Sequence, residues 1–236
     1  MEEKTIKERV VNYAKNKHYF HINDLKKYFA ERKIEFKEET LEKTVYRLKK
    51  TGLIYGAGKG WYSTIKEEFK LDTKPIKKIV TLVKKKFPLL EFSCWSTEQI
   101  KGYFHHLPSQ FVTFVHADKD FLQSLKDFLS DSRYNVYLNP RKREAEKYVE
   151  LNKNTTILRP AVSYRKSKNN NWAKIEKILV DLFMETKKIN LMDMEEYKKI
   201  MSNIVLDYRI NMAELLDHAD RRGIKKRMQK IIVDLL

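Results

Sequence analysis

A set of hydrogen-bond donors recurs at helical spacing after residue 36 and reappears in a glycine-rich turn. Its members are lysine, arginine, threonine and tyrosine side chains: Lys37, Thr40, Lys43, Thr44, Tyr46, Arg47, Lys50 and Lys59. Cationic groups neutralise phosphates, and an arginine in the major groove can bind the edge of a guanine with two hydrogen bonds. We therefore predict that these eight residues form a DNA-binding surface, and we predict no catalytic residue.

Seven of the eight donors lie in or beside a predicted helix over Glu38–Lys50. Its apolar residues Leu41, Val45 and Leu48 recur at helical spacing, so one narrow stripe is expected to face a core and the donors to face outward. Gly52 follows two lysines and is expected to end the helix, since glycine adopts the positive φ of a helix stop without steric cost.

A short hairpin is predicted directly after this helix. Residues 53–55 and Trp61–Ser63 flank the turn GAGKG, with Lys59 at its tip, where it can reach a phosphate. Glu38 and Glu39 lie at the opposite end of the helix, and Glu39, near the DNA-facing side, must either accept from a cytosine amine or be repelled. Contact is therefore expected mainly from the second half of the helix and from Lys59.

Two further helices are predicted before this unit, over residues 5–17 and Ile22–Glu31, the second capped by His21 or Asn23. Three helices followed by a hairpin are the outline of a winged helix-turn-helix domain, which we place at residues 1–66. The charged stretch that follows ends at a proline, and we predict a linker over residues 67–75.

The pattern changes after residue 75. A short basic helix over residues 76–87 precedes four predicted strands, at 90–95, 111–116, 135–138 and 155–158, and helical segments at 97–103 and 121–129. A polar segment over residues 163–171 is expected to be a loop, and the remainder reads as helices. The predicted fold class is α+β: an N-terminal winged helix-turn-helix followed by a mixed α/β domain with a helical C-terminal part, at residues 76–236.

The chain of 236 residues has a net charge of +17. An excess of this size favours a polyanionic partner, either nucleic acid or an anionic membrane surface, although a lysine-rich proteome produces the same excess without any specific partner. Basic residues exceed acidic ones both before and after residue 66, so charge does not indicate which part binds. Basic runs at 141–147, 165–168 and 221–227 are interpreted either as solvated surface or as further phosphate contacts.

The N-terminal sequence MEEKTIKERV lacks the apolar core of a signal peptide, and no segment approaches the roughly 20 apolar residues of a membrane span. We therefore predict a cytoplasmic protein with no membrane partner. Cys94 is the single cysteine, which excludes an internal disulfide and a cysteine-cluster zinc site. No cofactor is predicted.

Other residues were considered for chemistry. His105, His106 and His116 are not predicted to bind metal, because adjacent side chains diverge and no carboxylate follows at helical spacing. Asp118 and Asp120 are expected to end a strand and cap the next helix. They are also the acids that an alternative function would use, that of a nuclease or other nucleic-acid enzyme targeted by the winged helix. A third possibility is a winged-helix scaffold for protein partners.

Four strings together resemble the AbiEi-like antitoxins of type IV toxin–antitoxin, or abortive-infection, systems. LKKTGLIYGAGKGWYS resembles the end of that family's recognition helix and its wing, and FSCWST its strand and capped helix. WAKIEKILVDLF, with Glu176, Lys177 and Asp181, resembles its characteristic helix, and LLDHADRRG, with Ala219, Arg221 and Gly223, its late-helix motif.

The resemblance implies a DNA-binding transcriptional repressor that binds double-stranded DNA at inverted repeats of its own promoter. It also implies an antitoxin activity in the second domain against a nucleotidyltransferase-like toxin, without a stable complex of the two proteins. The family's antitoxin residues are not placed in this sequence, so the implied site consists of the winged-helix positions alone.

Overall fold

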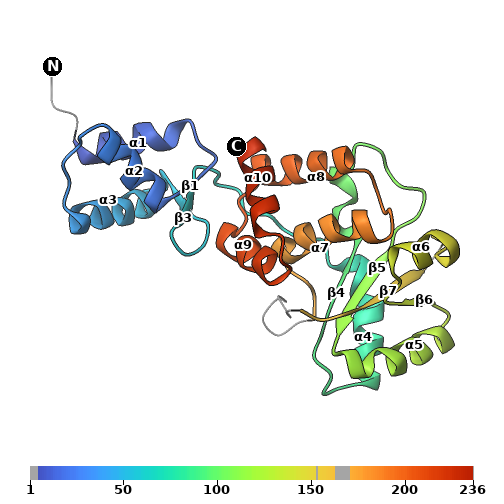
Figure 1. Ribbon diagram of the computed structural model, residues 1–236. Helices are drawn as coiled ribbons and strands as arrows, with labels where there is room; N and C mark the ends of the chain where they lie inside the picture. Colours follow the sequence, from blue (N-terminus) through green and yellow to red (C-terminus); the bar gives the residue numbers. More distant parts are fainter. Residues whose placement is uncertain (1–4, 153, 163–170, 236) are drawn as a thin grey trace. The chain divides into compact units, whose positions relative to one another are not determined.

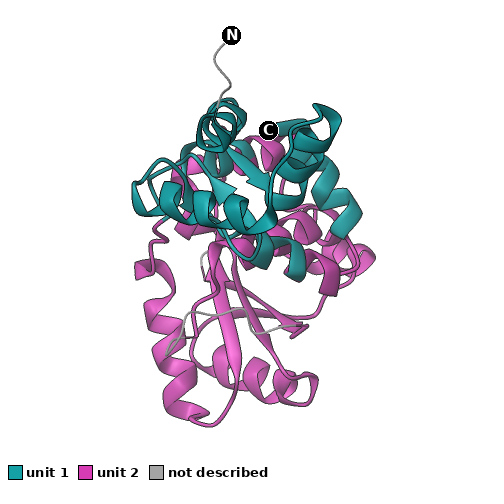
Figure 2. Ribbon diagram, turned by 90° about the vertical axis from the view of Figure 1, so that its left-hand side faces the viewer, with its two compact units in different colours: residues 1–69, 202–217, 225–236 teal, residues 70–201, 218–224 magenta. Residues whose placement is uncertain are grey.

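The computed structural model describes residues 5–152, 154–162 and 171–235. The chain divides into two compact units, which Figure 2 colours separately: residues 1–69, 202–217 and 225–236 form the first, and residues 70–201 and 218–224 the second. The predicted mixed fold class is confirmed, since helices and two sheets occur together. The first unit includes two C-terminal segments that the sequence analysis placed in the second domain.

The N-terminal part of the first unit contains the three predicted helices, α1 (Ile6–Lys15), α2 (Ile22–Glu31) and α3 (Glu38–Lys50). A capping box between Thr5 and Glu8 starts α1, and the His21 side chain caps α2 by accepting a hydrogen bond from the Asn23 backbone. Gly52 follows α3 with a φ of 70°, as predicted. The helices enclose one apolar core: Val10, Ala14, Phe20, Leu25, Phe29, Leu41, Val45, Leu48 and Ile54.

A small antiparallel sheet adjoins the three helices. Its strands are β1 (Tyr19–His21), β2 (Tyr55–Gly56) and β3 (Trp61–Ser63), in the order β1–β3–β2. The hairpin was predicted but β1 was not, because a three-residue strand has no period of its own and is defined by its pairing with β3. The element order is compatible with a winged helix-turn-helix.

The C-terminal segment around residues 208–213 holds the hairpin in place within the first unit. The Tyr19 hydroxyl donates to the Tyr208 carbonyl at 2.7 Å and accepts from the Ile210 N–H at 2.9 Å. The Met212 N–H donates to the Ala57 carbonyl at 2.9 Å. Gly58 has a φ of 108°, and a Cβ there would lie 2.2 Å from the Asn211 Oδ1 atom. The turn therefore needs glycine both for its backbone and for this close approach.

Residues 65–67, at the boundary of the predicted linker, are bound to the same C-terminal segment. The Arg209 guanidinium donates to the carbonyls of Ile65 and Lys66 at 3.1 and 2.5 Å, and its backbone N–H donates to the Glu67 carbonyl at 2.7 Å. Residues 65–67 consequently have fixed hydrogen-bond partners.

The second unit is built on a four-stranded sheet with the order β4–β5–β7–β6 (Figure 1). The strands are β4 (Phe92–Ser96), β5 (Thr113–Ala117), β6 (Asn135–Leu138) and β7 (Thr155–Pro160). β4 and β5 are antiparallel, whereas β7 runs parallel to both β5 and β6. All four strands were predicted, with ends that differ by up to a few residues.

Helices α4 (Lys77–Lys86) and α5 (Leu122–Asp131) pack on one face of this sheet through a shared apolar core: Ile79, Val83, Cys94, Val115, Leu125, Leu129 and Leu158. Cys94 is fully buried, and burial raises the pKa of its thiol. The opposite face carries Trp95, Phe114, His116 and Arg159, which alternate with these residues along the strands. Helix α7 (Ile175–Lys188) contacts this face through the Arg159–Glu185 ion pair and through Asp181, which lies beside His116.

The remaining elements are short helices and the C-terminal helices. The described residues include three 3-10 helices, η1 (Lys74–Ile76), η2 (Thr97–Tyr103) and η3 (Lys119–Phe121). Helix η2 has the bounds of the predicted helix at 97–103, and η1 and η3 directly precede α4 and α5. α6 (Lys142–Tyr148) was not predicted and lies in one of the basic runs. α8 (Met194–Asp207), α9 (Met212–Arg221) and α10 (Lys225–Leu235) complete the chain. Most of the predicted loop, residues 163–170, lies outside the described residues. Within the described part of the chain, no helix is long and apolar enough to cross a membrane.

Candidate nucleic-acid interface

α3 separates its side chains into two faces. Leu41 and Leu48 are fully buried, and Val45 nearly so, which fixes the rotation of the helix against the core. Burying each such side chain stabilises the fold by about 1.5–3 kcal/mol. Lys43 and Arg47 consequently face solvent, together with Tyr46, whose side chain is 60% exposed. An aromatic ring so exposed in a small basic helix is available for contact with a partner.

The other predicted residues are placed around this face. Lys37 and Thr40 are exposed at the start of the helix, and Lys59 is exposed in the hairpin turn. The Thr44 hydroxyl donates to the Thr40 carbonyl at 2.7 Å, so its proton is used within the helix and its oxygen remains an acceptor. The Lys50 ammonium lies 5.6 Å from the centre of the Tyr46 ring. The exposed residues thus lie on one helix and one turn of the same unit.

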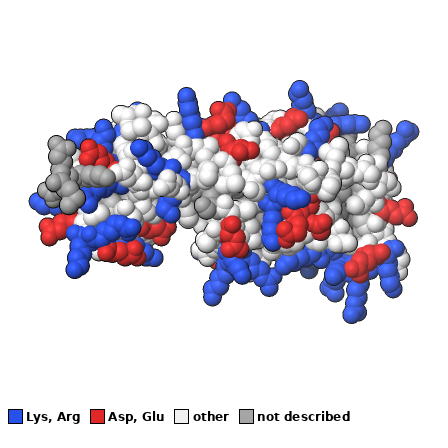
Figure 3. Space-filling view, turned by 90° about the horizontal axis from the view of Figure 1, so that it is seen from above, with Lys and Arg blue, Asp and Glu red and all other residues white. Residues whose placement is uncertain are grey.

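Acidic residues limit the first half of this face. Glu38 forms a 2.6 Å ion pair with Lys26 of α2, and this hydrogen bond lowers the pKa of Glu38. The Glu39 carboxylate lies 3.9 Å from the Lys43 ammonium. Arg47 and Lys50 lie a turn or more beyond these carboxylates. Figure 3 shows the same intermixing on a wider scale, with acidic side chains lying among the basic ones on the face it presents. The cationic character of α3 therefore increases toward its C-terminal end.

A buried charge cluster in the second unit was not predicted as a site. Its centre is the Asp181 carboxylate of α7, which is fully buried and forms an ion pair with Lys177 one turn earlier. His218 Nε2 lies 3.1 Å from Asp181 Oδ1, and an Arg222 guanidinium nitrogen lies 3.0 Å from the same oxygen. His116 Nε2, from β5, lies 3.5 Å from Asp181 Oδ2. One carboxylate thus gathers side chains from α7, β5 and residues 218–222.

The ionisation of the cluster follows from burial and these partners. Burial by itself raises the pKa of Asp181, but Lys177 and the other cationic partners lower it well below its ordinary range. Burial, with the charge of Lys177, lowers the pKa of His116 well below the ordinary value of 6.5. Burial also lowers the pKa of His218, although Asp181 opposes this. The cluster therefore holds an ionised aspartate and neutral histidines near pH 7.

The neutral His116 ring has a defined donor on one side. Trp95 Nε1 donates to His116 Nε2 at 3.3 Å, so the ring proton lies on Nδ1, which has no hydrogen-bond partner within the described residues. Arg222 Nε likewise lacks a hydrogen-bond partner there. A second buried pair joins β7 to α7: Arg159 of β7 donates from Nε to Glu185 of α7 at 3.0 Å and from NH1 to the Pro140 carbonyl at 2.7 Å.

Part of the charge cluster could have been recognised from the sequence. Lys177 and Asp181 are four residues apart on a helix whose other positions are mostly apolar, a spacing at which opposite charges pair. A lysine and an aspartate on the apolar side of a helix need partners, but the identity of His116, His218 and Arg222 as those partners depends on tertiary contacts. The basic run at 221–227 therefore includes one residue, Arg222, that faces a buried carboxylate.

The residues considered for metal chemistry lie elsewhere. The backbone N–H groups of His105 and His106 donate to Glu196 at 2.6 and 3.2 Å. Asp118 caps η3 by accepting from the Asp120 N–H at 3.0 Å, as predicted. Among the residues that the structure describes, no three His, Cys, Asp or Glu side chains are grouped so that they could hold a metal ion. The nuclease alternative thus rests on the sheet-and-helix pattern with its scattered acids and basic patches.

The fold and these two groups of residues define a two-unit α+β protein with an exposed basic helix in one unit and a buried charge cluster in the other. The chain belongs to a family of unknown function, DUF6577, whose model matches residues 40–236. The match begins within α3 and includes all of the second unit. No curated protein matches the chain.

Replacing the central carboxylate tests the cluster. Asp181→Asn preserves shape but leaves Lys177 and Arg222 buried without a counter-charge, so the free energy of unfolding measured in urea should fall by about 3–5 kcal/mol. The matched control, Glu39→Gln, removes an exposed carboxylate one turn from a lysine and should change stability little. Equal effects of the two substitutions would show that Asp181 is not needed as a charge.

The neutral histidines predict a pH dependence. Because the pKa of His116 and His218 is lower in the folded state, the unfolded chain binds more protons below pH 6.5, and stability is lost as the pH falls. Between pH 6 and pH 5 each such histidine should lower the free energy of unfolding by up to about 1.4 kcal/mol. His116→Gln should make this decline shallower in urea titrations at successive pH values. A variant that declines as steeply as the wild type would contradict the assignment.

Proposed function

We propose that this protein is a DNA-binding transcriptional repressor and the antitoxin of a type IV toxin–antitoxin, or abortive-infection, system. The observation that carries the first half is the outward face of α3, where Lys43, Tyr46 and Arg47 are exposed opposite a fully buried apolar stripe. A helix anchored in this way can enter a major groove with its donors toward the bases.

The hairpin supports the same proposal. Lys59 is exposed in a turn whose neighbours, Ala57 and Gly58, are held by residues 211–213. A turn with fixed backbone loses little conformational freedom when its lysine binds a phosphate, so a larger part of the electrostatic attraction remains as affinity. The proposed partner is double-stranded DNA carrying inverted repeats of the protein's own promoter.

Support for the antitoxin half comes from the strings that resemble AbiEi-like antitoxins. WAKIEKILVDLF contains Lys177 and Asp181, and LLDHADRRG contains His218 and Arg222, so the charge cluster joins the two strings. The proposed target is a nucleotidyltransferase-like toxin, neutralised without a stable complex. The cluster's role in this proposal is to hold α7 and residues 218–222 in one arrangement.

Binding to upstream DNA tests the repressor. Arg47→Ala with Lys59→Ala should weaken binding at low salt and reduce the slope of log K against log salt by about 2, because two cations are removed from the binding surface. Fluorescence anisotropy with the labelled upstream duplex measures both quantities. The control Lys7→Ala with Lys15→Ala removes the same charge from the exposed side of α1. If both double variants lose affinity equally, α3 and the hairpin are not the binding surface.

Growth rescue tests the antitoxin. Co-expression of the full chain with the nucleotidyltransferase-like toxin of a neighbouring reading frame should restore growth, and affinity capture should recover no stable complex. The Arg47→Ala/Lys59→Ala variant should still rescue growth while failing to repress a promoter fusion, because the altered residues lie outside the second unit. Failure of the wild-type chain to rescue growth would refute the antitoxin proposal and leave the repressor proposal standing.

A further inference from the structure

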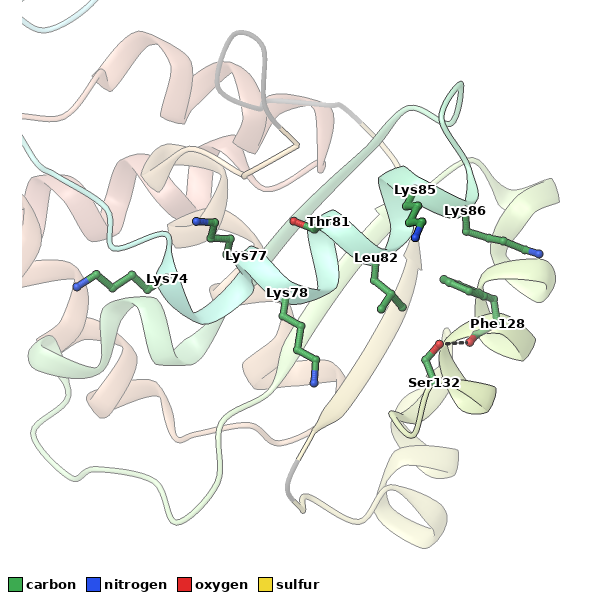
Figure 4. A pocket seen from close by; sticks show the side chains of 9 residues that line it. All are labelled: Lys74, Lys77, Lys78, Thr81, Leu82, Lys85, Lys86, Phe128 and Ser132. Carbon is green, nitrogen blue, oxygen red and sulfur yellow. Dashed lines mark hydrogen bonds between the residues drawn. The ribbon is translucent and has the colours of Figure 1, made fainter.

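An open groove lies between α4 and α5 of the second unit, with a volume of about 800 Å³ (Figure 4). It is separate from α3 and from the charge cluster. Its walls come from two helices and the short η1 helix before them: Lys74, Lys77, Lys78, Thr81, Leu82, Lys85, Lys86, Phe128 and Ser132. Both helices are anchored to the same face of the sheet by a shared apolar core, so the groove is held open by packed elements.

The charge of the groove has a single sign. Five of its nine lining residues are lysines and none is acidic. These lysines are exposed, and within the described residues none of their ammonium groups pairs with a carboxylate. α4 itself has the sequence KKIVTLVKKK, in which every charged residue is a lysine. Five lysines lining one groove without an acidic residue raise the local positive potential and favour an anionic ligand.

The floor of the groove is apolar. Leu82 of α4 and Phe128 of α5 point toward one another in Figure 4. The Phe128 ring packs edge-on against Phe87 with 5.6 Å between centroids, and the Lys86 ammonium lies 5.8 Å from its centre. The ring is therefore oriented by its neighbours but remains partly exposed beside a cation. An aromatic ring in this setting can stack on a nucleic-acid base.

We propose that this groove binds single-stranded nucleic acid, with the lysines along the phosphates and a base on Phe128. Lys77 to Lys86 extend about 14 Å along the helix axis, enough to meet successive phosphates of one strand. A duplex hides the faces of its bases in the stack and leaves Phe128 without a partner. A single nucleotide leaves most of this row of cations unused. An acidic peptide satisfies the lysines but offers no planar group to the floor.

The donors also indicate how selective this binding is. Lysine ammonium groups are point charges on flexible stems, suited to phosphates but not to reading base edges. The Ser132 hydroxyl donates to the Phe128 carbonyl at 2.9 Å, so its proton is already used. The groove is therefore expected to bind single strands with little sequence preference. The proposed promoter binding differs, since it uses the α3 residues of the first unit.

Fluorescence anisotropy with labelled 20-nucleotide dT and U oligomers tests the groove in the full-length protein. Lys74→Gln/Lys78→Gln/Lys85→Gln should weaken binding at least tenfold at about 0.1 M salt and reduce the slope of log K against log salt by about 2. The control Lys84→Gln/Lys119→Gln/Lys147→Gln removes the same charge from exposed lysines outside the groove and should keep most of the affinity. Phe128→Leu retains an apolar side chain but removes the ring, and should weaken binding about tenfold.

Competition experiments test whether the groove binds single-stranded nucleic acid and not other anions, and the Arg47→Ala/Lys59→Ala variant distinguishes the groove from the promoter-binding surface. An excess of unlabelled dT oligomer should displace the probe, whereas ATP or poly-glutamate at equal charge should not; displacement by either would overturn the proposal. Equal affinity of the groove and control variants for the oligomers would also overturn it. The Arg47→Ala/Lys59→Ala variant should bind the oligomers as the wild type does, so failure of promoter binding and failure of the groove are distinguishable.

Discussion

The Asp181 carboxylate is fully buried, and an ionised group in that position is stable only while cations and donors surround it. Its charged and donor partners are Lys177, one turn earlier on the same helix, and His218 with Arg222 near the end of α9, far along the chain; the neutral His116 ring of β5 lies beside it. Removing Asp181 would leave Lys177 and Arg222 uncompensated where water cannot compensate for them. The cluster therefore ties the central helix α7, the sheet and residues 218–222 of the second unit to one arrangement.

The same constraint explains the unusual burial of α7. Glu176, Lys177, Asp181 and Glu185 are buried on a helix that also buries Ile178, Leu179 and Leu182. A helix enclosed on all sides normally has apolar residues around its whole circumference. Here the polar positions are compensated in pairs, Asp181 with its cations and Glu185 with Arg159. Such pairs contribute little net stability compared with apolar residues, but they penalise any other packing of the helix.

In the first unit, positioning of the exposed donors depends on ordinary apolar packing. Leu41, Val45 and Leu48 set the rotation of α3, and the donors on the opposite face follow from helical geometry. The hairpin depends on more distant residues, since Ala57, Tyr19 and residues 65–67 are hydrogen-bonded to the segment around Arg209. A change near residue 209 would therefore reach the Lys59 turn, although it lies about 150 residues away along the chain.

Local interactions allowed the bounds of α2 and α3 to be predicted to the residue, with His21 as one of two candidate caps for α2, because periodic burial, cap side chains and Gly52 all act within a few positions of one another. The exposed donors of α3 and Lys59 followed from the same local geometry. The strand β1, the binding of residues 65–67 by Arg209, the α4–α5 groove and the partners of Asp181 did not. Each of these depends on contacts between residues far apart in sequence. Such contacts form only in the folded chain, because packing of apolar surface determines which buried polar groups lie close enough to pair.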